Sequence, residues 1–565
     1  MKLMIRISLL TFLLNCTLCK CSKKTSSGNN NIGTINPPAF SLQSWSVNDN
    51  SLKTTFYNIT TNPVLKFSFS GALNKSTVTP LSITFINEAG TSVNYNSNFI
   101  NNDSVLLISP TSPLSHLARY TISVTTDLKS IQGKNLTSGL SLNIITNIDS
   151  SRKFPPISDD SLLTLTQKQT FKYFWDYGHP VSGLARERSN ATPETVTTGG
   201  SGFGIMSILV GIHRGFITRT EGLTRLQTIV SFLKNTADKF HGAFPHWLNG
   251  TNGKTIPFSQ KDNGADLVET SYLMQGLLCA RQYFNTADIN ETNLRNDINT
   301  LWNGVEWNWF RQNNQNILFW HWSPDYNWEM NFPIKGWNEC LITYVLAASS
   351  TTYAIPSIVY TNGWTANGTN GFYNGALYYG LQLPLGPAYG GPLFFSHYSF
   401  LGINPNGLTD AYANYQVQTK NHTLINYNYC KANTKNYFGY SDSCWGLTAS
   451  DIKNGYTASS PTNDVGFIAP TAALSSFPYT PTESMKALKF FYYVLGDKIW
   501  KDYGFVDAFS LNDLWYANSH LAIDQGPIIV MIENYRSGLL WNLFTSCPEV
   551  KNGMKNVLGF SAPYL

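Results

Sequence analysis

Three acidic residues lie close together in the segment KDNGADLVETSYLMQG, residues 261–276. Asp262, Asp266 and Glu269 have offsets of 0, 4 and 7 residues, which places their side chains on one face of a helix. No Lys or Arg lies between or directly after them to relieve the repulsion of like charges, and an apolar run follows. A helix dipole tolerates carboxylates at its N-terminal end, so we expect these acids to begin a buried helix and to face a cleft.

Two other apolar runs also begin with an acid. Glu339 precedes CLITYVLAASS, and Asp524 and Gln525 precede GPIIVMI. N-capping explains a single acid of this kind, and Asp524 fits that explanation as well as it fits a site. Glu is a poor N-cap, so Glu339 indicates a site. The pattern predicts that carboxylates from three separate helix starts converge on one hollow.

Loops rich in aromatic and hydrogen-bonding residues accompany these acids. They are GLARERSN, FHGAFPHWLNG, FWHWSPDYNWEMNF and FFSHYSFLGINP. Tryptophan faces bind the apolar faces of sugar rings, while Arg, Asn, His and acidic side chains bind the hydroxyls. Paired carboxylates between aromatic walls suit glycoside hydrolysis, in which one acid protonates the leaving oxygen and a second activates water or attacks carbon. The residues that we predict to contact the substrate are Asp262, Arg186, His246, Trp247, Trp328, Trp337, His397 and Gln525.

Other chemistries find little support in the sequence. The glycine-rich GGSGFG (199–204) follows no predicted strand and lacks the lysine of a P-loop. Neither GxSxG nor HExxH occurs, the nine His are scattered, and the five Cys beyond the leader have no CxxC spacing, which argues against a metal site. Cys430 and Cys444 could pair across a loop, although a protein of this size needs no such staple. The net charge of +5 comes from basic residues within positions 1–24, so the remainder is neutral and nucleic acid is not an expected partner.

The first residues predict an export signal. Lys2 and Arg6 precede the apolar run ISLLTFLLNCTL, which is too short for a membrane span. The stretch CKCSKKTSSGNNN that follows resembles the start of a bacterial lipoprotein, with Cys21 as the lipidated residue and Cys19 and Cys16 as competitors. A plain secretory signal is the other interpretation. Both place the protein outside the cytoplasm, and the lipoprotein interpretation places it at the outer membrane or in the periplasm.

The chain divides into a β-rich part and a helical part. After a signal peptide (1–21) and a polar tether (22–38), short β-branched stretches between Pro, Gly and Asn turns predict an Ig-like β-sandwich over 39–148. From 155 to 565 the pattern is helical and aromatic, and it holds 14 of the 15 Trp, so the aromatic walls belong to this part. It shows no βαβ alternation and no fixed repeat, which indicates one large all-α domain, and a closed toroid of helix hairpins fits best. Long irregular loops are expected at 364–405 and 419–470.

With these residues in place, the helical part resembles glycoside hydrolase family 144, long labelled "putative glucoamylase" in bacterial genomes. The resemblance rests on KDNGADLVETSYLMQGLL, WSPDYNWEMNFPIKGWNECLITYVLAASS, CWGLTASD, GFIAPTAALSSFPYTP and NSHLAIDQGPIIVMIENYRSGLLWNLF. It covers roughly residues 155–548, in the order and spacing of the family. The part before it resembles the bacterial Ig-like domains found ahead of secreted enzymes.

The resemblance implies an (α/α)6 toroid that hydrolyses β-1,2-glucan or its oligosaccharides without a metal or a cofactor. Members of the family are endo-acting, with inversion, or exo-acting with release of the disaccharide sophorose. The carboxylates that it implies as catalytic are Glu269, Glu339, Asp524 and Asp266. The sequence leaves the acid and the base open: our hypothesis is that Glu269 or Glu339 donates the proton and Asp524 helps to activate water.

The expected partner is the glucan alone, for a monomer that meets the membrane only through its lipid anchor. Two alternatives stay open on the sequence. One is a hydrolase of another glucan or oligosaccharide on the same fold, and the other is a surface glycan-binding protein that has lost catalysis.

Overall fold

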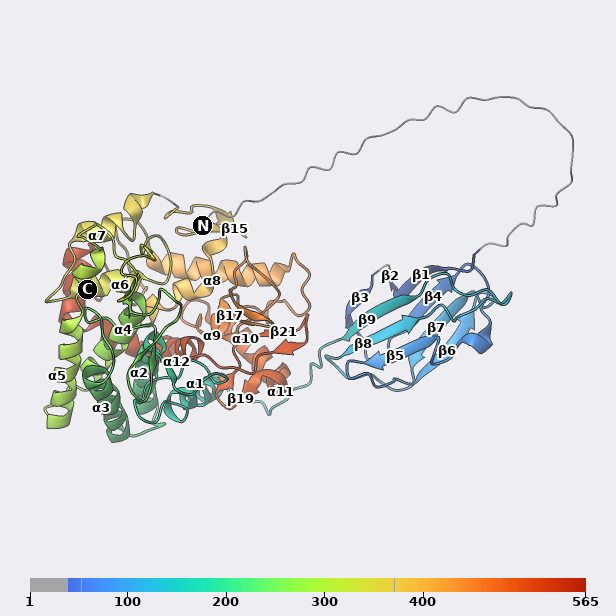
Figure 1. Cartoon of the computed structure of the whole chain (residues 1–565), viewed down its shortest axis with the longest axis horizontal. Coiled ribbons are helices and arrows are strands. Elements are labelled where there is room, and N and C mark those ends of the chain that lie inside the picture. The colour runs from blue at the N-terminus through green and yellow to red at the C-terminus, as the bar shows by residue number, and fades with distance from the viewer. Residues whose placement is uncertain (1–38, 52, 370) are drawn as a thin grey trace, which may run out of the picture.

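The computed structural model describes residues 39–51, 53–369 and 371–565. The expected signal peptide, the tether and the lipidated Cys21 lie outside the described residues. A β-rich body is followed along the chain by a larger helical body (Figure 1). Within the described ranges, no helix combines the length and the hydropathy that crossing a bilayer requires.

The β-rich body consists of two sheets that share one core. In β4 (Leu65–Phe69) the side chains of Leu65, Phe67 and Phe69 are buried while Lys66 is exposed, because successive side chains of a strand point to opposite faces. One sheet has the order β2-β1-β4-β7-β6 and the other β3-β9-β8-β5, with β3 and β9 parallel. The remaining strands are β1 (Leu42–Val47), β2 (Asn50–Ser51), β3 (Thr55–Ile59), β5 (Ile83–Asn87), β6 (Tyr95–Ile100), β7 (Val105–Pro110), β8 (Arg119–Val124) and β9 (Leu140–Thr146).

The two bodies touch near the end of the sandwich. The ring centroids of Tyr57 and Phe438 lie 6.1 Å apart, and Ile145 is buried in a cluster formed mostly by residues of the helical body. The segment that leads into the helices is also held, because Phe154 stacks on Tyr492 with centroids 4.5 Å apart. The sandwich is therefore joined to the helical body by packing as well as by the chain.

The helical body consists of α-helices of different lengths. The α-helices are α1 (Asp159–Trp175), α2 (Thr198–His213), α3 (Arg219–Asn235), α4 (Leu267–Tyr283), α5 (Ile289–Gly304), α6 (Leu341–Ser349), α7 (Ser357–Asn362), α8 (Tyr415–Ala432), α9 (Pro470–Leu474), α10 (Pro481–Lys489), α11 (Gly496–Ile499), α12 (Ala522–Ser537), α13 (Leu539–Thr545) and α14 (Pro548–Asn552).

Short strands and turns connect these helices. The strands are β10 (Thr195–Thr197), β11 (Trp247–Asn249), β12 (Thr255–Ile256), β13 (Ala265–Asp266), β14 (His321–Trp322), β15 (Leu377–Tyr378), β16 (Leu381–Gln382), β17 (Ala449–Ile452), β18 (Gly455–Ala458), β19 (Trp500–Lys501), β20 (Gly504–Phe505), β21 (Phe509–Ser510) and β22 (Trp515–Tyr516). Three-residue to five-residue helical turns are η1 (Lys75–Thr77), η2 (Trp307–Arg311), η3 (Ala366–Gly368), η4 (Ala388–Gly390), η5 (Leu393–Ser396), η6 (Ser399–Leu401), η7 (Phe490–Val494) and η8 (Gly553–Val557).

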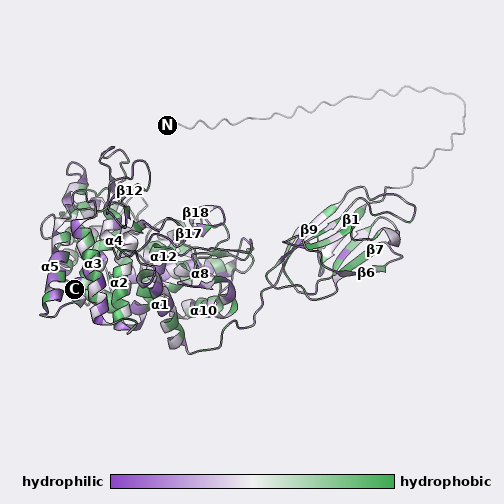
Figure 2. Ribbon diagram, turned by 60° about the horizontal axis from the view of Figure 1, so that its bottom comes forward, coloured by the Kyte–Doolittle hydropathy of each residue, from purple (hydrophilic) through white to green (hydrophobic). Residues whose placement is uncertain are grey.

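Helix α2 packs against both α4 and α12, and its residues are mainly hydrophobic (Figure 2). Glycines permit the close approach of α2 and α4. A Cβ on Gly202 would lie 2.1 Å from the carbonyl oxygen of Tyr272, and a Cβ on Gly276 would lie 2.2 Å from the carbonyl oxygen of Gly202. The glycine-rich GGSGFG thus serves helix packing, and the packing fixes where α4 and α12 begin.

The expectation that Asp262, Asp266 and Glu269 form one helical stripe was wrong. Helix α4 begins at Leu267, so Asp262 precedes it and Asp266 is its N-cap, accepting from the backbone N–H groups of Val268 and Glu269. An Asp side chain competes for backbone N–H groups and so ends a helix rather than continuing it. The three acids nevertheless stay close together in space, as the next section shows.

The expectation of an irregular loop over 419–470 was also wrong at its start, because α8 occupies residues 415–432. The sequence of α8, YQVQTKNHTLINYNYCKA, is polar and lacks a clear apolar stripe. Its polar side chains are buried instead: His422 is fully enclosed and bonds to Ser396 and to the backbone of Gly391. Tertiary hydrogen bonds therefore stabilise a helix that hydropathy does not mark.

The cysteines are buried free thiols. All five in the described part of the chain are reduced, including Cys430 on α8 and Cys444. These two residues therefore form no disulfide, and the helical body is held without a covalent cross-link between them.

Candidate active site

A cavity of about 440 Å³ lies where α2, α4 and α12 begin. Its lining combines carboxylates with aromatic rings, as the sequence predicted for a sugar site. The acids are Glu187, Glu269 and Glu339, and the aromatic rings are those of Trp247, Phe258, Tyr272, Trp320, Phe394, Tyr398 and Tyr456.

Two glutamates reach the cavity from two different helix starts. Glu269 lies in the first turn of α4, and its Oε2 accepts a 2.7 Å hydrogen bond from the backbone N–H of Gly199. A Cβ at Gly199 would lie 2.5 Å from that oxygen, so glycine is needed there. Glu339 lies two residues before α6, and the hydroxyls of Ser399 and Tyr272 both donate to its backbone carbonyl.

Both glutamates hold a proton more tightly than an exposed Glu. Burial raises the pKa of Glu339 to about 7 against the effect of its own backbone N–H, and the charges of Glu269 and Asp266 add to the rise. Burial also raises the pKa of Glu269, although the charge of His246 opposes it. Glu339 keeps some accessible surface because it faces the cavity, while protein surrounds it elsewhere. A carboxyl group with a pKa near neutrality is suited to give and regain a proton.

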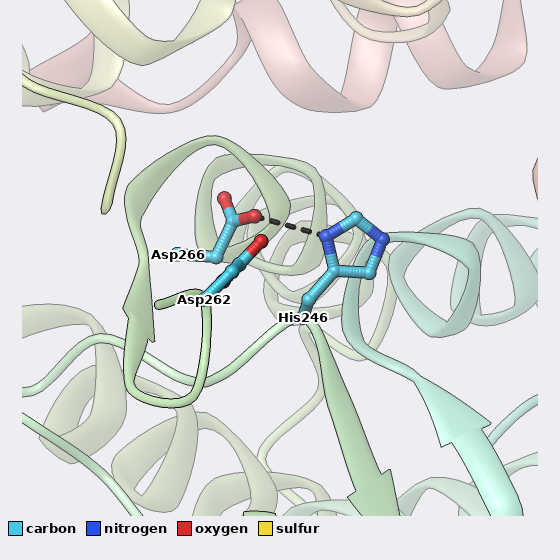
Figure 3. A group of neighbouring side chains, drawn as sticks. All are labelled: His246, Asp262 and Asp266. Atoms are coloured by element: carbon cyan, nitrogen blue, oxygen red, sulfur yellow. Dashed lines mark hydrogen bonds and ion pairs between the residues drawn. The ribbon is translucent and has the colours of Figure 1, made fainter. Parts of the chain in front are cut away.

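Two histidines and two aspartates form a compact group beside Glu269, which we name the α4 cluster: His246, His321, Asp262 and Asp266. Figure 3 shows both aspartates pointing toward the imidazole of His246. The Nδ1 of His246 lies 3.0 Å from Oδ2 of Asp266, and Nε2 of His321 lies 3.4 Å from Oδ2 of Asp262. Strands β13 and β14 pair with Asp266 opposite His321, which brings these two side chains together.

The α4 cluster holds a proton on His246 at neutral pH. Burial disfavours the charged imidazole, but the charge of Glu269 and the hydrogen bond to Asp266 outweigh it and raise the pKa of His246 to about 9. Burial, and then the charge of Asp266, raise the pKa of Asp262. The pKa of Asp266 is lowered despite its burial, mainly because His246 donates to it. Burial lowers the pKa of His321.

The same atoms could hold a divalent cation. One ligand atom from each of His246, Asp262 and Asp266 lies within 4.8 Å of the others, and Oδ1 of Asp262 is buried with no hydrogen-bond partner among the described residues. Imidazole and carboxylate are ligands of zinc and related metals. The proton that His246 holds at neutral pH would compete with such a metal for Nδ1.

Five charged residues form a second group at the start of α12, which we name the α12 cluster: Glu187, Arg188, Asp451, Asp507 and Asp524. The Nη1 of Arg188 donates to both carboxylate oxygens of Asp451, at 3.0 and 3.2 Å, and its Nε donates to Glu187 at 2.9 Å. The backbone N–H of Asp451, on β17, donates to Oδ2 of Asp507 at 2.6 Å. Asp524 lies in the first turn of α12, as its sequence pattern predicted.

The α12 cluster contains more negative groups than its one cation can neutralise. Burial, and then the charge of Asp451, raise the pKa of Asp507. Burial, and then the charge of Asp507, raise the pKa of Asp524 well above its usual range, and the two carboxyl groups are in hydrogen-bonding contact. Arg188 opposes both effects, but its guanidinium is already bonded to Glu187 and Asp451.

Several predicted substrate contacts lie elsewhere in the described structure. Arg186 donates to the backbone carbonyls of Pro193 and Tyr177 and is absent from the cavity lining. His397 is 2% exposed and bonds to Ser476 at 3.0 Å, and burial lowers its pKa to about 3, as expected for a neutral core histidine. Arg186 is thus bonded to backbone carbonyls, and His397 is packed in the core.

The remaining aromatic and amide side chains that we predicted as substrate contacts also lie outside the cavity lining. Trp337 is 4% exposed and packs in the core, and Trp328 packs against Trp309 with ring centroids 4.8 Å apart. Gln525 is 1% exposed and donates to the carbonyl of Phe505. None of the three lines the cavity formed by the described residues. By contrast, His246 and Trp247 line it, and Asp262 belongs to the α4 cluster.

Sequence reasoning missed several residues that the structure brings to the cavity. Arg188 lines it from the same GLARERSN segment as Arg186, two positions further on. Tyr456, on β18, is 49% exposed and yet lines the cavity and lies near the charge of Asp524. Phe258 is 50% exposed and stacks on His246. Isolated polar or aromatic residues in loops carry no local signal of this kind.

A larger hollow of about 890 Å³ lies on the outside of α1, α10 and α12. Its charged groups already neutralise each other: Lys489 pairs with Asp159, and Arg536 pairs with Asp160. It contains no group of closely placed buried acids among its lining residues. The smaller cavity is therefore the candidate active site.

Comparison with known proteins agrees with this architecture. The profile of the family described as "Putative glucoamylase" matches residues 331–548, and that of the "Bacterial Ig-like domain" matches residues 41–146. One curated relative, named exo beta-1,2-glucooligosaccharide sophorohydrolase (non-reducing end), from Parabacteroides distasonis, is 47% identical over 71% of this chain, and the match spans 58% of that relative's length.

Two solved structures are similar over most of the chain. An endo-beta-1,2-glucanase from Chitinophaga pinensis, in complex with sophorotriose and glucose, is 53% identical with a TM-score of 0.71, covering 73% of this chain and 100% of that one. A beta-1,2-glucanase from Parabacteroides distasonis is 38% identical with a TM-score of 0.69, covering 92% of this chain and 73% of that one.

Fold and site together define a protein in which an Ig-like sandwich precedes a helical domain with a carboxylate-lined cavity. The chain belongs to the glucoamylase-like family that the profile describes, which is glycoside hydrolase family 144.

Proposed function

We propose that this protein is a glycoside hydrolase that cleaves β-1,2-glucan or its oligosaccharides by acid–base catalysis with inversion, on an (α/α)6 toroid. The observation that carries the proposal is the convergence of Glu269 and Glu339, from the starts of α4 and α6, on one aromatic-walled cavity whose wall also includes the start of α12, next to Asp524. The names of the similar proteins from Parabacteroides distasonis and Chitinophaga pinensis supply the linkage.

Glu339 is the better candidate for the general acid. Its pKa near 7 keeps a proton available at neutral pH, and its carboxyl group faces the cavity. Glu269 also faces the cavity, but the backbone N–H of Gly199 and the charge of His246 both favour its ionised form. Glu339 therefore protonates the glycosidic oxygen as its bond to the anomeric carbon breaks, and Glu269 stabilises the positive charge that develops on the sugar ring.

Asp524 is the candidate proton acceptor. A water molecule attacks the anomeric carbon from the face opposite to the leaving oxygen and passes its proton to Asp524. Asp524 is 1% exposed and lies behind the cavity wall, near the phenol groups of Tyr398 and Tyr456, so the proton travels through substrate hydroxyls or water. Because Asp524 is not among the residues that line the cavity, a relay fits better than direct attack on carbon.

The α4 cluster positions the site rather than reacting. Asp266 was predicted as catalytic, but it is fully buried, caps α4 and bonds to His246. His246 lines the cavity beside Trp247 and Phe258, which form an aromatic wall for a sugar ring. Asp266 thus holds His246 in place and charged, so that His246 can donate to a substrate hydroxyl.

Incubation of the purified protein with β-1,2-glucan, followed by chain-length analysis of the products over time, tests the proposal. Release of sophorose from the start indicates exo action, whereas a falling series of longer oligosaccharides indicates endo action. A parallel panel of β-1,3-glucan, β-1,4-glucan and starch separates the alternative of another glucan. Tight binding of β-1,2-glucan with no products would support the non-catalytic glycan-binding alternative instead.

Export and lipid anchoring are also proposals, and they rest on the sequence of residues 1–38. Lipidation at Cys21 predicts incorporation of labelled fatty acid by the full-length chain and none by a Cys21→Ser variant. If incorporation persists in this variant and is lost only on substitution of Cys19 or Cys16, that cysteine is the lipidated residue instead. We propose a monomer, which sedimentation of the protein without its leader tests.

A further inference from the structure

Asp507 is a buried acid that neither the sequence pattern nor the proposed reaction uses. It lies between β20 and β21, is 1% exposed, and its Oδ2 accepts the backbone N–H of Asp451 at 2.6 Å. Its carboxyl group is in hydrogen-bonding contact with that of Asp524, which is also 1% exposed. Both acids thus lie in the wall behind the cavity rather than at its surface.

The two carboxyl groups lack other donors. With both ionised, Oδ1 of Asp507 and both side-chain oxygens of Asp524 have no hydrogen-bond donor among the described residues. Two ionised carboxylates offer only acceptors to each other, and burial makes an unsatisfied charged oxygen costly. One proton between the two groups supplies the missing donor and removes one negative charge.

The surroundings do not offer a cation in place of that proton. The charged and titratable groups that face the pair are Arg188, Glu187, Asp451, Tyr173, Tyr398 and Tyr456. Arg188 is the one cation in this set, and it is bonded to Glu187 and to both oxygens of Asp451. Ser519 also donates to Asp451 at 2.5 Å, so the carboxylate that anchors Asp507 is itself held on two sides.

We propose that Asp507 is a positioning residue that shares one proton with Asp524, so that the two carboxyl groups act as a single proton-accepting pair. Asp451, on β17, fixes the position of Asp507 through its backbone N–H, and Arg188, in the segment before β10, fixes the position of Asp451. The inference rests on the proposed function for its catalytic consequence, but the shared proton itself does not.

The pair changes how the proton acceptor works. Before reaction it carries one proton and one negative charge. When water attacks the anomeric carbon, its proton passes to the ionised member, while Glu339 gives its own proton to the leaving oxygen. The pair then holds two protons and Glu339 is ionised, and exchange with solvent restores both. The shared proton donates a hydrogen bond to the ionised member and stabilises its charge, so the buried pair still offers an ionised acceptor near neutral pH.

The variant Asp507→Asn tests the pair with little change in shape. Asn keeps the size of Asp and can donate an N–H to Asp524, but it cannot hold the shared proton, and its amide N–H stabilises an ionised Asp524 less than a carboxylic acid does. We expect kcat to fall by roughly tenfold and the acidic limb of the kcat/KM profile to move up by about one pH unit, with KM unchanged. The matched control is Asp513→Asn, a half-buried Asp on the β21–β22 turn that belongs to neither cluster. This control should change neither the acidic limb of the kcat/KM profile nor kcat.

A second measurement does not depend on activity. A carboxyl group whose pKa is raised on folding contributes stability below its unfolded pKa, and that contribution is lost as the pH rises through the folded value. The wild-type melting temperature should therefore fall more steeply between pH 5 and pH 9 than that of Asp507→Asn. Asp524→Asn should flatten the curve in the same way, and the double variant should flatten it no further, because either single change already removes the shared proton.

These outcomes separate the pair from the reaction. A lower kcat with an unmoved limb, or parallel melting curves in all four proteins, would mean that Asp507 has a purely structural role and would overturn the proposal. A wild-type protein that cleaves no β-1,2-glucan, but whose melting curve flattens as described in both single variants, would retain the pair and reject the proposed function. If Asp507→Asn fails to fold, the Asp524→Asn curve still decides whether the proton is shared.

Discussion

The α4 cluster and the α12 cluster both bury several acids beside one cavity, but they neutralise them differently. The α4 cluster uses imidazoles: His246 carries a proton at neutral pH and bonds to Asp266. The α12 cluster has one arginine, which is bonded to Glu187 and Asp451. Its positive charge reaches Asp524 only from a distance, and the charge of Asp507 opposes it there. On one side of the cavity a titratable cation therefore offsets the acids, and on the other side a permanently charged one does.

This difference separates two tasks that one site must perform. A general acid must keep its proton near neutrality, and a general base must lose its own, so their environments must push their pKa values in different ways. Around Glu339, burial and neighbouring carboxylates keep a proton in place. Around Asp524, burial and then the charge of Asp507 raise the pKa, and the fixed charge of Arg188 opposes that rise. The balance at Asp524 is thus set by residues on other elements.

Glu339→Gln should have the largest effect, because it removes the proton donor on the α4 side and keeps its shape. We expect kcat on β-1,2-glucan to fall by about 10³-fold, within the range that general acid catalysis contributes. The loss should be much smaller for an activated substrate whose leaving group needs no proton. The matched control is Glu88→Gln on the Ig-like sandwich, where Glu88 is exposed and lies 3.9 Å from Arg119. Near-normal turnover by Glu339→Gln would assign the acid to Glu269.

His246→Gln should show that the α4 cluster depends on a titratable cation. The pKa of His246 is raised from 6.5 to about 9, so its pairing stabilises the fold fully below about pH 6.5 and loses this effect as the pH rises through about 9. We expect the variant to be less stable by about 3 kcal/mol at pH 6 and to approach the wild type near pH 10. Denaturant unfolding at several pH values measures this. His116→Gln, an exposed site on the sandwich, is the control, and a pH-independent difference would reject the ion-pair explanation.

Gly202→Ala should disturb the spacing of the two clusters without touching either. Helix α2 packs against α4 through Gly202, and against α12 where a Cβ on Gly526 would lie 2.4 Å from the Cβ of Phe203. An added methyl at Gly202 forces the backbones apart, and we expect a loss of about 1–3 kcal/mol in the free energy of unfolding. Gly304→Ala, at the end of α5, has nothing within 4 Å of the new Cβ and should be neutral. Equal stability of the two variants would contradict the close-packing argument.

The sequence predicted the α4 side of the site better than the α12 side. Glu269, Glu339 and Asp524 stand alone at the start of apolar runs, so hydropathy marks them, and the structure places all three at or just behind the cavity. The helical stripe was the wrong reason for the acids at 262–269, because Asp266 caps the helix. The acids still meet, since the β13–β14 pairing folds the loop back onto itself.

The residues that sequence reasoning could not place owe their positions to long-range pairing. Asp451 reaches the α12 cluster through the β17–β18 hairpin, and Asp507 meets it through a backbone hydrogen bond across 56 residues. Arg188, rather than Arg186, faces the cavity because the segment pairs with Leu521 ahead of α12. Trp337 and His397 have polar or aromatic neighbours in sequence but core neighbours in space. Local composition indicates neither the long-range pairing of a segment nor the neighbours of a side chain in space.

Removal of metal should have the smallest effect, and it bears on what neutralises the α4 cluster. His246, Asp262 and Asp266 are close enough to bind a cation, but a proton on His246 already offsets part of their charge. We therefore expect treatment with EDTA, followed by gel filtration, to leave kcat/KM and the melting temperature unchanged. Added Zn²⁺ should instead inhibit, more strongly at pH 9 than at pH 6, because it must displace that proton to bind. Asp262→Asn should weaken the inhibition, with Asp325→Asn on the exposed neighbouring loop as the matched control. Loss of activity on chelation, restored by one metal ion per chain, would show that a metal rather than a proton balances the acids on this side of the cavity.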